Sequence, residues 1–106
     1  MIFIELPLFQ KRLQFTDEEL RALQNDLLKN PRRGDVIKGS GGLRKIRIPM
    51  PGRGKRGGGR VIYSFQDKKN RCYLLLAYDK SATRDITPER ASQLAAIVTE
   101  ELRTGQ

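Results

Sequence analysis

Histidine is absent from this chain of 106 residues, and cysteine occurs only once. Without histidine the chain lacks the commonest general base and the commonest metal ligand, and it cannot build a Ser-His or Cys-His nucleophile. Any catalysis must therefore use lysine, arginine, tyrosine or carboxylates, and we expect neither a metal nor another cofactor. The single Cys72 excludes an intramolecular disulfide and a thiolate metal cluster. Its place in the apolar run RCYLLLAY predicts a buried small hydrophobe.

Long apolar runs are also missing. No segment approaches the roughly 20 apolar residues that a membrane-spanning helix needs. The start MIFIELPLFQ lacks the basic beginning and long apolar core of a signal peptide. We therefore expect a cytoplasmic protein without a membrane partner. The length and the hydrophobic share of 38% predict a single domain over residues 1–106.

Acidic residues are absent from residues 36–66, and almost all of the net positive charge lies there. The stretch VIKGSGGLRKIRIPMPGRGKRGGGRVIYSFQ holds eight Lys or Arg, against a formal net charge of +9 for the chain. It also holds eight of the ten glycines, whose backbone N–H groups can approach phosphate oxygens closely. A local positive field of this kind requires an anionic partner. Solubility alone would not place it between core strands, and an anionic membrane would require an amphipathic basic helix, so nucleic acid is the predicted anion.

The hydrophobic pattern predicts the order strand, helix, strand, strand, strand, helix. Thr16 and Glu19 fit a capping box that begins the first helix, and Asn30-Pro31 ends it. Thr87 caps the second helix, with Pro88 at its first position. Strands are expected over residues 2–5, 43–48, 60–66 and 71–78. We expect a small α+β domain with an antiparallel sheet, both helices packed on one face, and the basic strand and loop on the other.

The strand over residues 43–48 carries its charges in a row. Ile46 and Ile48 share one strand face, while Lys45 and Arg47 share the other. The following loop contains GRGKRG, a literal G-x-G-x-x-G, but it does not open a helix as a dinucleotide fingerprint must. Three aromatic side chains can stack on bases, Tyr63, Tyr73 and Tyr78, although Tyr63 and Tyr73 can equally belong to the core.

Such a basic strand permits RNA cleavage without histidine. Attack of a ribose 2′-hydroxyl on the adjacent phosphate needs a proton acceptor, cations for the phosphate oxygens and a proton donor for the leaving 5′-oxygen. Lysine crowded by other cations loses its proton more readily than lysine in water, so a cluster can supply both acid and base. Arginine adds fixed charge and forked hydrogen bonds to phosphate.

The blocks GDVI-x-G-x-GG-LRK and GKRGG-x-R-V-I-Y, followed by YLLLAYDK and a final helix that begins TPE, resemble the HigB-type branch of the RelE/ParE toxin superfamily. The likeness spans nearly the whole chain. It implies a RelE-like α+β toxin of a type II toxin-antitoxin module that cleaves mRNA in the ribosomal A site. It further implies a cognate antitoxin, expected to be a helix-turn-helix protein, through which alone operator DNA would be contacted.

The resemblance also implies site residues. RelE-like members keep a K-x-K-like pair on a central strand and an Arg at the start of the next; Lys45 and Arg47 match the pair, and Arg60 matches the Arg. Lys80 lies where the family tends to keep another cation. We assign Lys45 as base, Arg47 and Arg60 to phosphate and transition-state contacts, and Lys80 as auxiliary cation or acid. Residues expected to hold the ribosomal or messenger backbone are Arg44, Arg53, Lys55 and Arg56.

Two departures from the pattern bear on this assignment. Arg47 replaces a lysine, and no tyrosine follows Lys80, where some relatives keep a catalytic one. Two alternative functions remain open at this point. The Gly-Arg-rich loop would suffice for a non-catalytic RNA- or ribosome-binding protein, and a ParE-like gyrase-directed toxin would share the fold without the basic cleavage strand.

Overall fold

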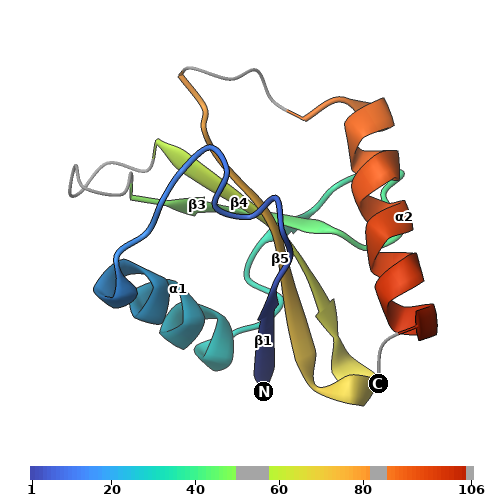
Figure 1. The fold of residues 1–106 in the computed structure, drawn as a ribbon, viewed down its shortest axis with the longest axis horizontal. Coiled ribbons are helices and arrows are strands. Elements are labelled where there is room, and N and C mark those ends of the chain that lie inside the picture. The colour runs from blue at the N-terminus through green and yellow to red at the C-terminus, as the bar shows by residue number, and fades with distance from the viewer. Residues whose placement is uncertain (50–57, 82–85, 105–106) are drawn as a thin grey trace.

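Short strands and two helices make up this protein (Figure 1). Its structure is a computed structural model that describes residues 1–49, 58–81 and 86–104. The predicted order of elements is confirmed, with a two-residue edge strand and a 3-10 helix added. In chain order the elements are β1 (Ile2–Glu5), α1 (Asp17–Lys29), β2 (Asp35–Val36), β3 (Arg44–Ile48), β4 (Gly59–Gln66), η1 (Asp67–Lys69), β5 (Arg71–Asp79) and α2 (Pro88–Thr104).

The strands form one five-stranded sheet in the order β1-β5-β4-β3-β2. The predicted class, a small α+β domain built on one sheet, is thereby confirmed, and β3, β4 and β5 form the expected antiparallel meander. The sheet is mixed, however, because β1 pairs with β5 in parallel. Strands that are neighbours in the sequence are joined by short connections, which favour antiparallel pairing, whereas β1 and β5 are far apart in the chain and are not so constrained.

The two helices cover opposite faces of the sheet, which corrects the expectation that both pack on one face (Figure 1). Val61 and Tyr63 of β4 belong to the hydrophobic cluster that holds the buried leucines of α1. Ile62, between them, belongs to the cluster that holds Leu94 and Val98 of α2. Successive residues of a strand point to opposite faces, so apolar residues at consecutive positions need a helix on each side.

The pairing of β4 with β5 contains one irregularity. Ile62 pairs with Leu76, and Tyr63 pairs with Leu74, so that Leu75 is an extra residue on β5. Leu75 and Leu76 consequently both lie in the cluster under α2. A bulge of this kind increases the local twist of the strands. The bulge lies two residues along β4 from Arg60, the basic residue of that strand.

Both helices begin as the sequence predicts. At the start of α1, the backbone N–H of Glu19 donates to the Thr16 hydroxyl oxygen at 3.1 Å, and the Glu19 carboxylate accepts from the Thr16 N–H at 2.9 Å. Asn30 is the residue that ends α1. At the start of α2, the Arg90 N–H donates to the hydroxyl oxygen of Thr87 at 3.1 Å. These bonds satisfy backbone donors that a helix start leaves without intrahelical partners.

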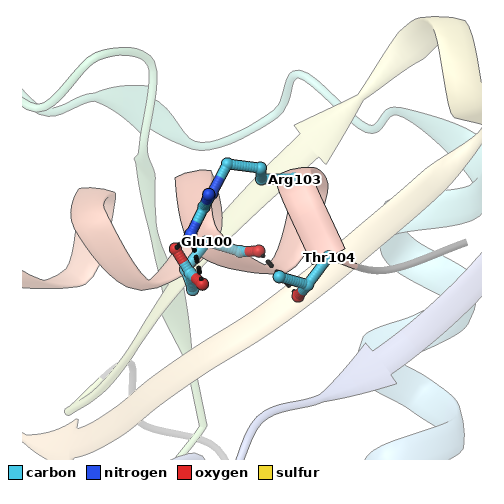
Figure 2. Close-up of polar contacts among 3 residues, drawn as sticks. All are labelled: Glu100, Arg103 and Thr104. Atoms are coloured by element: carbon cyan, nitrogen blue, oxygen red, sulfur yellow. Dashed lines mark hydrogen bonds and ion pairs between the residues drawn. The ribbon is translucent and has the colours of Figure 1, made fainter.

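The last turn of α2 is held by contacts that converge on Glu100 (Figure 2). Arg103 Nη2 lies 2.9 Å from both carboxylate oxygens of Glu100, and the hydroxyl of Thr104 donates to the Glu100 carbonyl oxygen at 2.9 Å. The ion pair is exposed and adds only a few tenths of a kcal/mol. Neither α2 nor any other helix in the described ranges is long and apolar enough to cross a membrane.

Candidate nucleic-acid interface

An open hollow of about 410 Å³ lies beside β3, at the basic part of the sheet. Most of the side chains around it are cationic, and they come from parts of the chain that are well separated in sequence. Its lining residues are Arg33, Gly34, Asp35, Lys45, Ile46, Arg47, Arg60 and Lys80. The four residues predicted from the sequence to be catalytic are therefore brought together around one hollow.

The sheet register explains this convergence. Lys45 pairs with Ile62 and Arg47 pairs with Arg60 across antiparallel strands, so the three cations share a face. That face is the one α2 packs against, because Ile62 belongs to the cluster of α2. The basic face therefore does not lie opposite both helices, as the sequence had suggested. Lys80 joins from the residue after β5, since its backbone N–H donates to the Gly58 carbonyl oxygen at 3.0 Å.

Arg47 and Arg60 differ in how much water reaches them. Arg47 is exposed, whereas Arg60 is only 7% exposed. Arg60 Nη1 donates to the carbonyl oxygen of Gly59 at 3.0 Å, which fixes the guanidinium close to its own strand. A guanidinium held in this way presents its charge to the hollow without having to order a long flexible side chain. The guanidinium of Arg60 can therefore contact a phosphate that lies in the hollow, whereas the exposed guanidinium of Arg47 can also reach a phosphate that is still in solvent.

Arg44 has contacts within the fold. Its Nη1 donates to the carbonyl oxygens of Arg32 at 3.0 Å and Gly34 at 2.7 Å. It is not one of the residues around the hollow. The contact of Arg44 with a messenger or ribosomal backbone, expected from the sequence, stays a prediction, but its guanidinium already holds the segment that precedes β2.

Tyr63 holds the same segment through its hydroxyl. That hydroxyl donates to the Pro31 carbonyl oxygen at 2.8 Å and accepts from the Gly34 N–H at 2.9 Å. Burial raises the pKa of this phenol, although the Gly34 hydrogen bond and nearby Arg44 oppose the shift. Gly34 must be a glycine here, because a Cβ would lie 2.9 Å from both the Lys45 carbonyl oxygen and Tyr63 Cε1. We call Tyr63 and Arg44 together the brace of residues 31–34.

Sequence reasoning missed the wall of the hollow that this brace supports. Arg33, Gly34 and Asp35 line the hollow, and Asp35 is the register partner of Lys45. Arg33 also makes an exposed ion pair with Asp26 of α1, with 3.2 Å between Arg33 Nη1 and Asp26 Oδ2. The available signal was the pair Gly34-Asp35 directly before the basic stretch, where a glycine precedes an edge strand that begins with a carboxylate.

The glycine-rich turn before β3 has a conformational role. Gly39, Gly41 and Gly42 all have positive φ, at 74°, 73° and 107°, which side chains other than glycine rarely adopt. The buried hydroxyl of Ser40 accepts from the Leu43 N–H at 3.0 Å and so closes the turn. The backbone conformation of this turn is enough to explain these three glycines, and contact with a phosphate is not needed to explain them.

The three tyrosines proposed for base stacking belong to the core: Tyr63, Tyr73 and Tyr78 are each at most 2% exposed. Base stacking is therefore wrong for all three in this structure, because a ring must be accessible to stack on a base, whereas the core alternative for Tyr63 and Tyr73 is confirmed. Cys72 is buried as predicted, and its burial raises the pKa of the thiol to about 12. The loop motif over residues 52–57, with Arg53, Lys55 and Arg56, lies outside the described residues.

Comparison with known proteins adds a family and a fold. The family model of the "RelE toxin of RelE / RelB toxin-antitoxin system" matches residues 6–104 of this chain. Among solved structures, a mutant of the E. coli toxin RelE in the free state, with two arginines replaced by alanine, superposes with a TM-score of 0.51 at 16% sequence identity. The alignment covers 92% of this chain and 98% of that one. At this identity the structural match supports the fold alone, whereas the family match covers nearly the whole chain.

Proposed function

Because this chain belongs to the RelE toxin family of RelE/RelB toxin-antitoxin systems, we propose that it is a ribosome-dependent endoribonuclease that cleaves mRNA in the A site. The single observation that supports this activity best is the hollow beside β3, where Lys45, Arg47, Arg60 and Lys80 meet. A phosphodiester bound there would be surrounded by positive charge. Inhibition of translation would follow from cutting the message.

The cations have distinct roles in this proposal. Arg47 and Arg60 lie opposite each other on neighbouring strands, so their guanidinium groups can contact different oxygens of one phosphate. They stabilise the negative charge that builds on the phosphate as the 2′-oxygen attacks. Lys80, an ammonium group at the rim that follows β5, donates a proton to the leaving 5′-oxygen. Lys45 lies next to the attacking hydroxyl and is the first candidate for the base that takes its proton. The reaction needs no metal.

Membership of the family implies a cognate antitoxin as partner. We further assign the chain to the HigB-type branch, on the blocks around residues 34–45 and 54–63. The antitoxin would be a helix-turn-helix protein that carries the contacts to operator DNA. Its acidic or helix-rich surface would cover the basic hollow or lie near it, since the same field that attracts RNA attracts carboxylates. A complex that leaves the hollow open would instead require steric exclusion from the ribosome.

Expression of the toxin in bacteria, with mRNA ends mapped during growth arrest, tests this proposal. We expect discrete cuts within translated messages for the wild-type protein and intact messages for Arg60→Ala. Intact messages during wild-type arrest would contradict the nuclease. If Arg60→Ala lowered RNA affinity but left arrest unchanged, a non-catalytic RNA-binding protein would account for the data. An altered supercoiling assay would point to a gyrase-directed toxin.

A further inference from the structure

We propose that the carboxylate of Asp35 accepts the proton of the attacking ribose 2′-hydroxyl, an inference that rests on the proposed nuclease activity. Asp35 is the one acidic side chain among the described residues that line the hollow. It lies on β2 directly opposite Lys45 on β3, in an antiparallel pair. Directly opposed residues of such a pair have Cβ atoms about 5 Å apart and share a face. The carboxylate therefore stands at the edge of the cationic surface, on the side that faces the substrate.

The position of Asp35 is built into the fold. The brace holds three of the four residues before Asp35, because its hydrogen bonds join the carbonyl oxygens of Pro31, Arg32 and Gly34 and the Gly34 N–H. Arg32 is held further, because its guanidinium carbon lies 5.2 Å from the centre of the Phe65 ring. Backbone fixed at this many points gives the next residue, Asp35, a defined place. A proton acceptor needs such placement, since proton transfer requires hydrogen-bond distance.

Competing acceptors are weaker candidates. The chain has no histidine, and its three tyrosines are buried in the core. The hydroxyl of Tyr63 is already engaged as donor to Pro31. A lysine must first lose its own proton before it can act as a base, whereas a carboxylate is ionised throughout the neutral range. This revises the assignment of Lys45 as the base. In the revised account Lys45 supplies positive charge beside the nucleophile.

The proposed step balances without a further reactant. The O–H bond of the 2′-hydroxyl breaks, and its proton passes to Asp35. The 2′-oxygen forms a bond to phosphorus, and the bond between phosphorus and the 5′-oxygen breaks. The 5′-oxygen takes a proton from Lys80, which leaves a 2′,3′-cyclic phosphate on one product and a 5′-hydroxyl on the other. Nothing is oxidised or reduced, and proton exchange with water resets Asp35 and Lys80.

The dependence of the rate on pH separates an aspartate base from a lysine base. Within residues 1–49, 58–81 and 86–104, the charged groups that share the hollow with Asp35 are all cationic: Arg33, Lys45, Arg47, Arg60 and Lys80. Ordinary aspartate is ionised above about pH 5 and ordinary lysine loses its proton only near pH 10. A carboxylate base therefore predicts a single-turnover cleavage rate that is nearly constant between about pH 6 and 8. With lysine as base, the rate should rise about tenfold for each pH unit over the same range.

Asp35→Asn is the decisive variant. It should lower the single-turnover rate by about 100-fold or more, the usual contribution of a general base, with little loss of ribosome binding. Lys45→Arg keeps the charge but cannot act as a base at neutral pH, so it should lower the rate much less than Asp35→Asn does. The matched control is Asp17→Asn, which removes the same charge from an exposed carboxylate in the first turn of α1. Asp35→Glu should recover part of the rate, and circular dichroism should verify the folding of each variant.

Each outcome bears on one proposal. Wild-type cleavage that Asp35→Asn leaves unchanged would overturn the role of Asp35 while the nuclease stands. A wild-type rate that rises steeply with pH, together with loss of activity in Lys45→Arg, would also overturn it, in favour of Lys45. A wild-type protein that cuts no message in the presence of ribosomes would contradict the proposed function itself.

Discussion

Arg47 on β3 and Arg60 on β4 are directly opposed across two antiparallel strands. Like charges in this position repel each other and destabilise the sheet. Arg60 is nearly buried, so the repulsion is not fully relieved by water. An arrangement that weakens the fold and gathers positive charge is typical of a site that binds an anion, because a bound phosphate would neutralise both groups.

Removing the charge of Arg47 should therefore stabilise the folded protein and at the same time slow its cleavage of mRNA. We expect Arg47→Gln to raise the free energy of unfolding by roughly 0.2–1 kcal/mol, as removal of an opposed like charge does. The same variant should cleave mRNA more slowly. Urea denaturation and single-turnover cleavage measure the two effects. Arg21→Gln, on the exposed side of α1, removes an equal charge away from the hollow and should change neither quantity appreciably. A less stable Arg47→Gln would contradict the expected repulsion.

The hydroxyl of Tyr63 should be important for stability. Tyr63→Phe leaves the Pro31 carbonyl and the Gly34 N–H without their partner in a buried place, so we expect a loss of about 1–3 kcal/mol in the free energy of unfolding. Thermal or urea unfolding measures the loss. The control is Tyr73→Phe, whose hydroxyl makes no hydrogen bond within the ranges that the structure describes and which should be nearly neutral. Equal stability of the two variants would show that the brace contributes little.

Gly34→Ala should disturb the wall of the hollow directly. The added methyl group would stand 2.9 Å from the backbone oxygen of Lys45, a contact that the backbone must shift to relieve. We expect a loss of about 1–3 kcal/mol in stability, as for other overpacked sites. Cleavage should also fall in the fraction that remains folded, because Asp35 follows immediately. Unaltered stability with unaltered cleavage would mean that the segment adapts without consequence.

Alkaline pH should destabilise the fold through Cys72. Burial raises the pKa of this thiol from 9.0 to about 12, so the folded state holds the proton more tightly than the unfolded state does. The thiol's contribution to stability is therefore complete below about pH 9 and is lost as the pH rises from 9 towards 12. Urea midpoints should fall more steeply between about pH 9 and 10.5 for the wild type than for Cys72→Ala. Parallel curves would contradict a raised pKa.

Much of the fold could be predicted because its local signals are strong. The capping box at Thr16 and the Thr87-Pro88 start placed both helices correctly, and alternation of Ile46 with Lys45 and Arg47 identified the basic strand. The sides taken by the helices could not be predicted in the same way. They depend on which apolar residues of β4 face each helix, and a strand that is apolar at consecutive positions leaves that choice to tertiary packing.

The cationic residues of the site could also be predicted from the sequence, because they lie on strands, or directly after one, whose pairing brings them together. Asp35 could not, because β2 is only two residues long and has no alternating pattern that would place Asp35 opposite Lys45. Arg44 shows a further limit of the sequence. Its charge suggested an RNA contact, yet its hydrogen bonds to Arg32 and Gly34 depend on a loop conformation that composition does not encode.

The most direct test of the cleaving surface uses purified toxin, ribosomes and a message that carries a single 2′-deoxynucleotide at the mapped cut site. If Arg47, Arg60 and Lys80 act on a phosphate attacked by the neighbouring 2′-oxygen, the all-ribose message will be cut to a 2′,3′-cyclic phosphate and a 5′-hydroxyl. The substituted message will stay intact at that position. Cutting of both messages at equal rates would contradict the account.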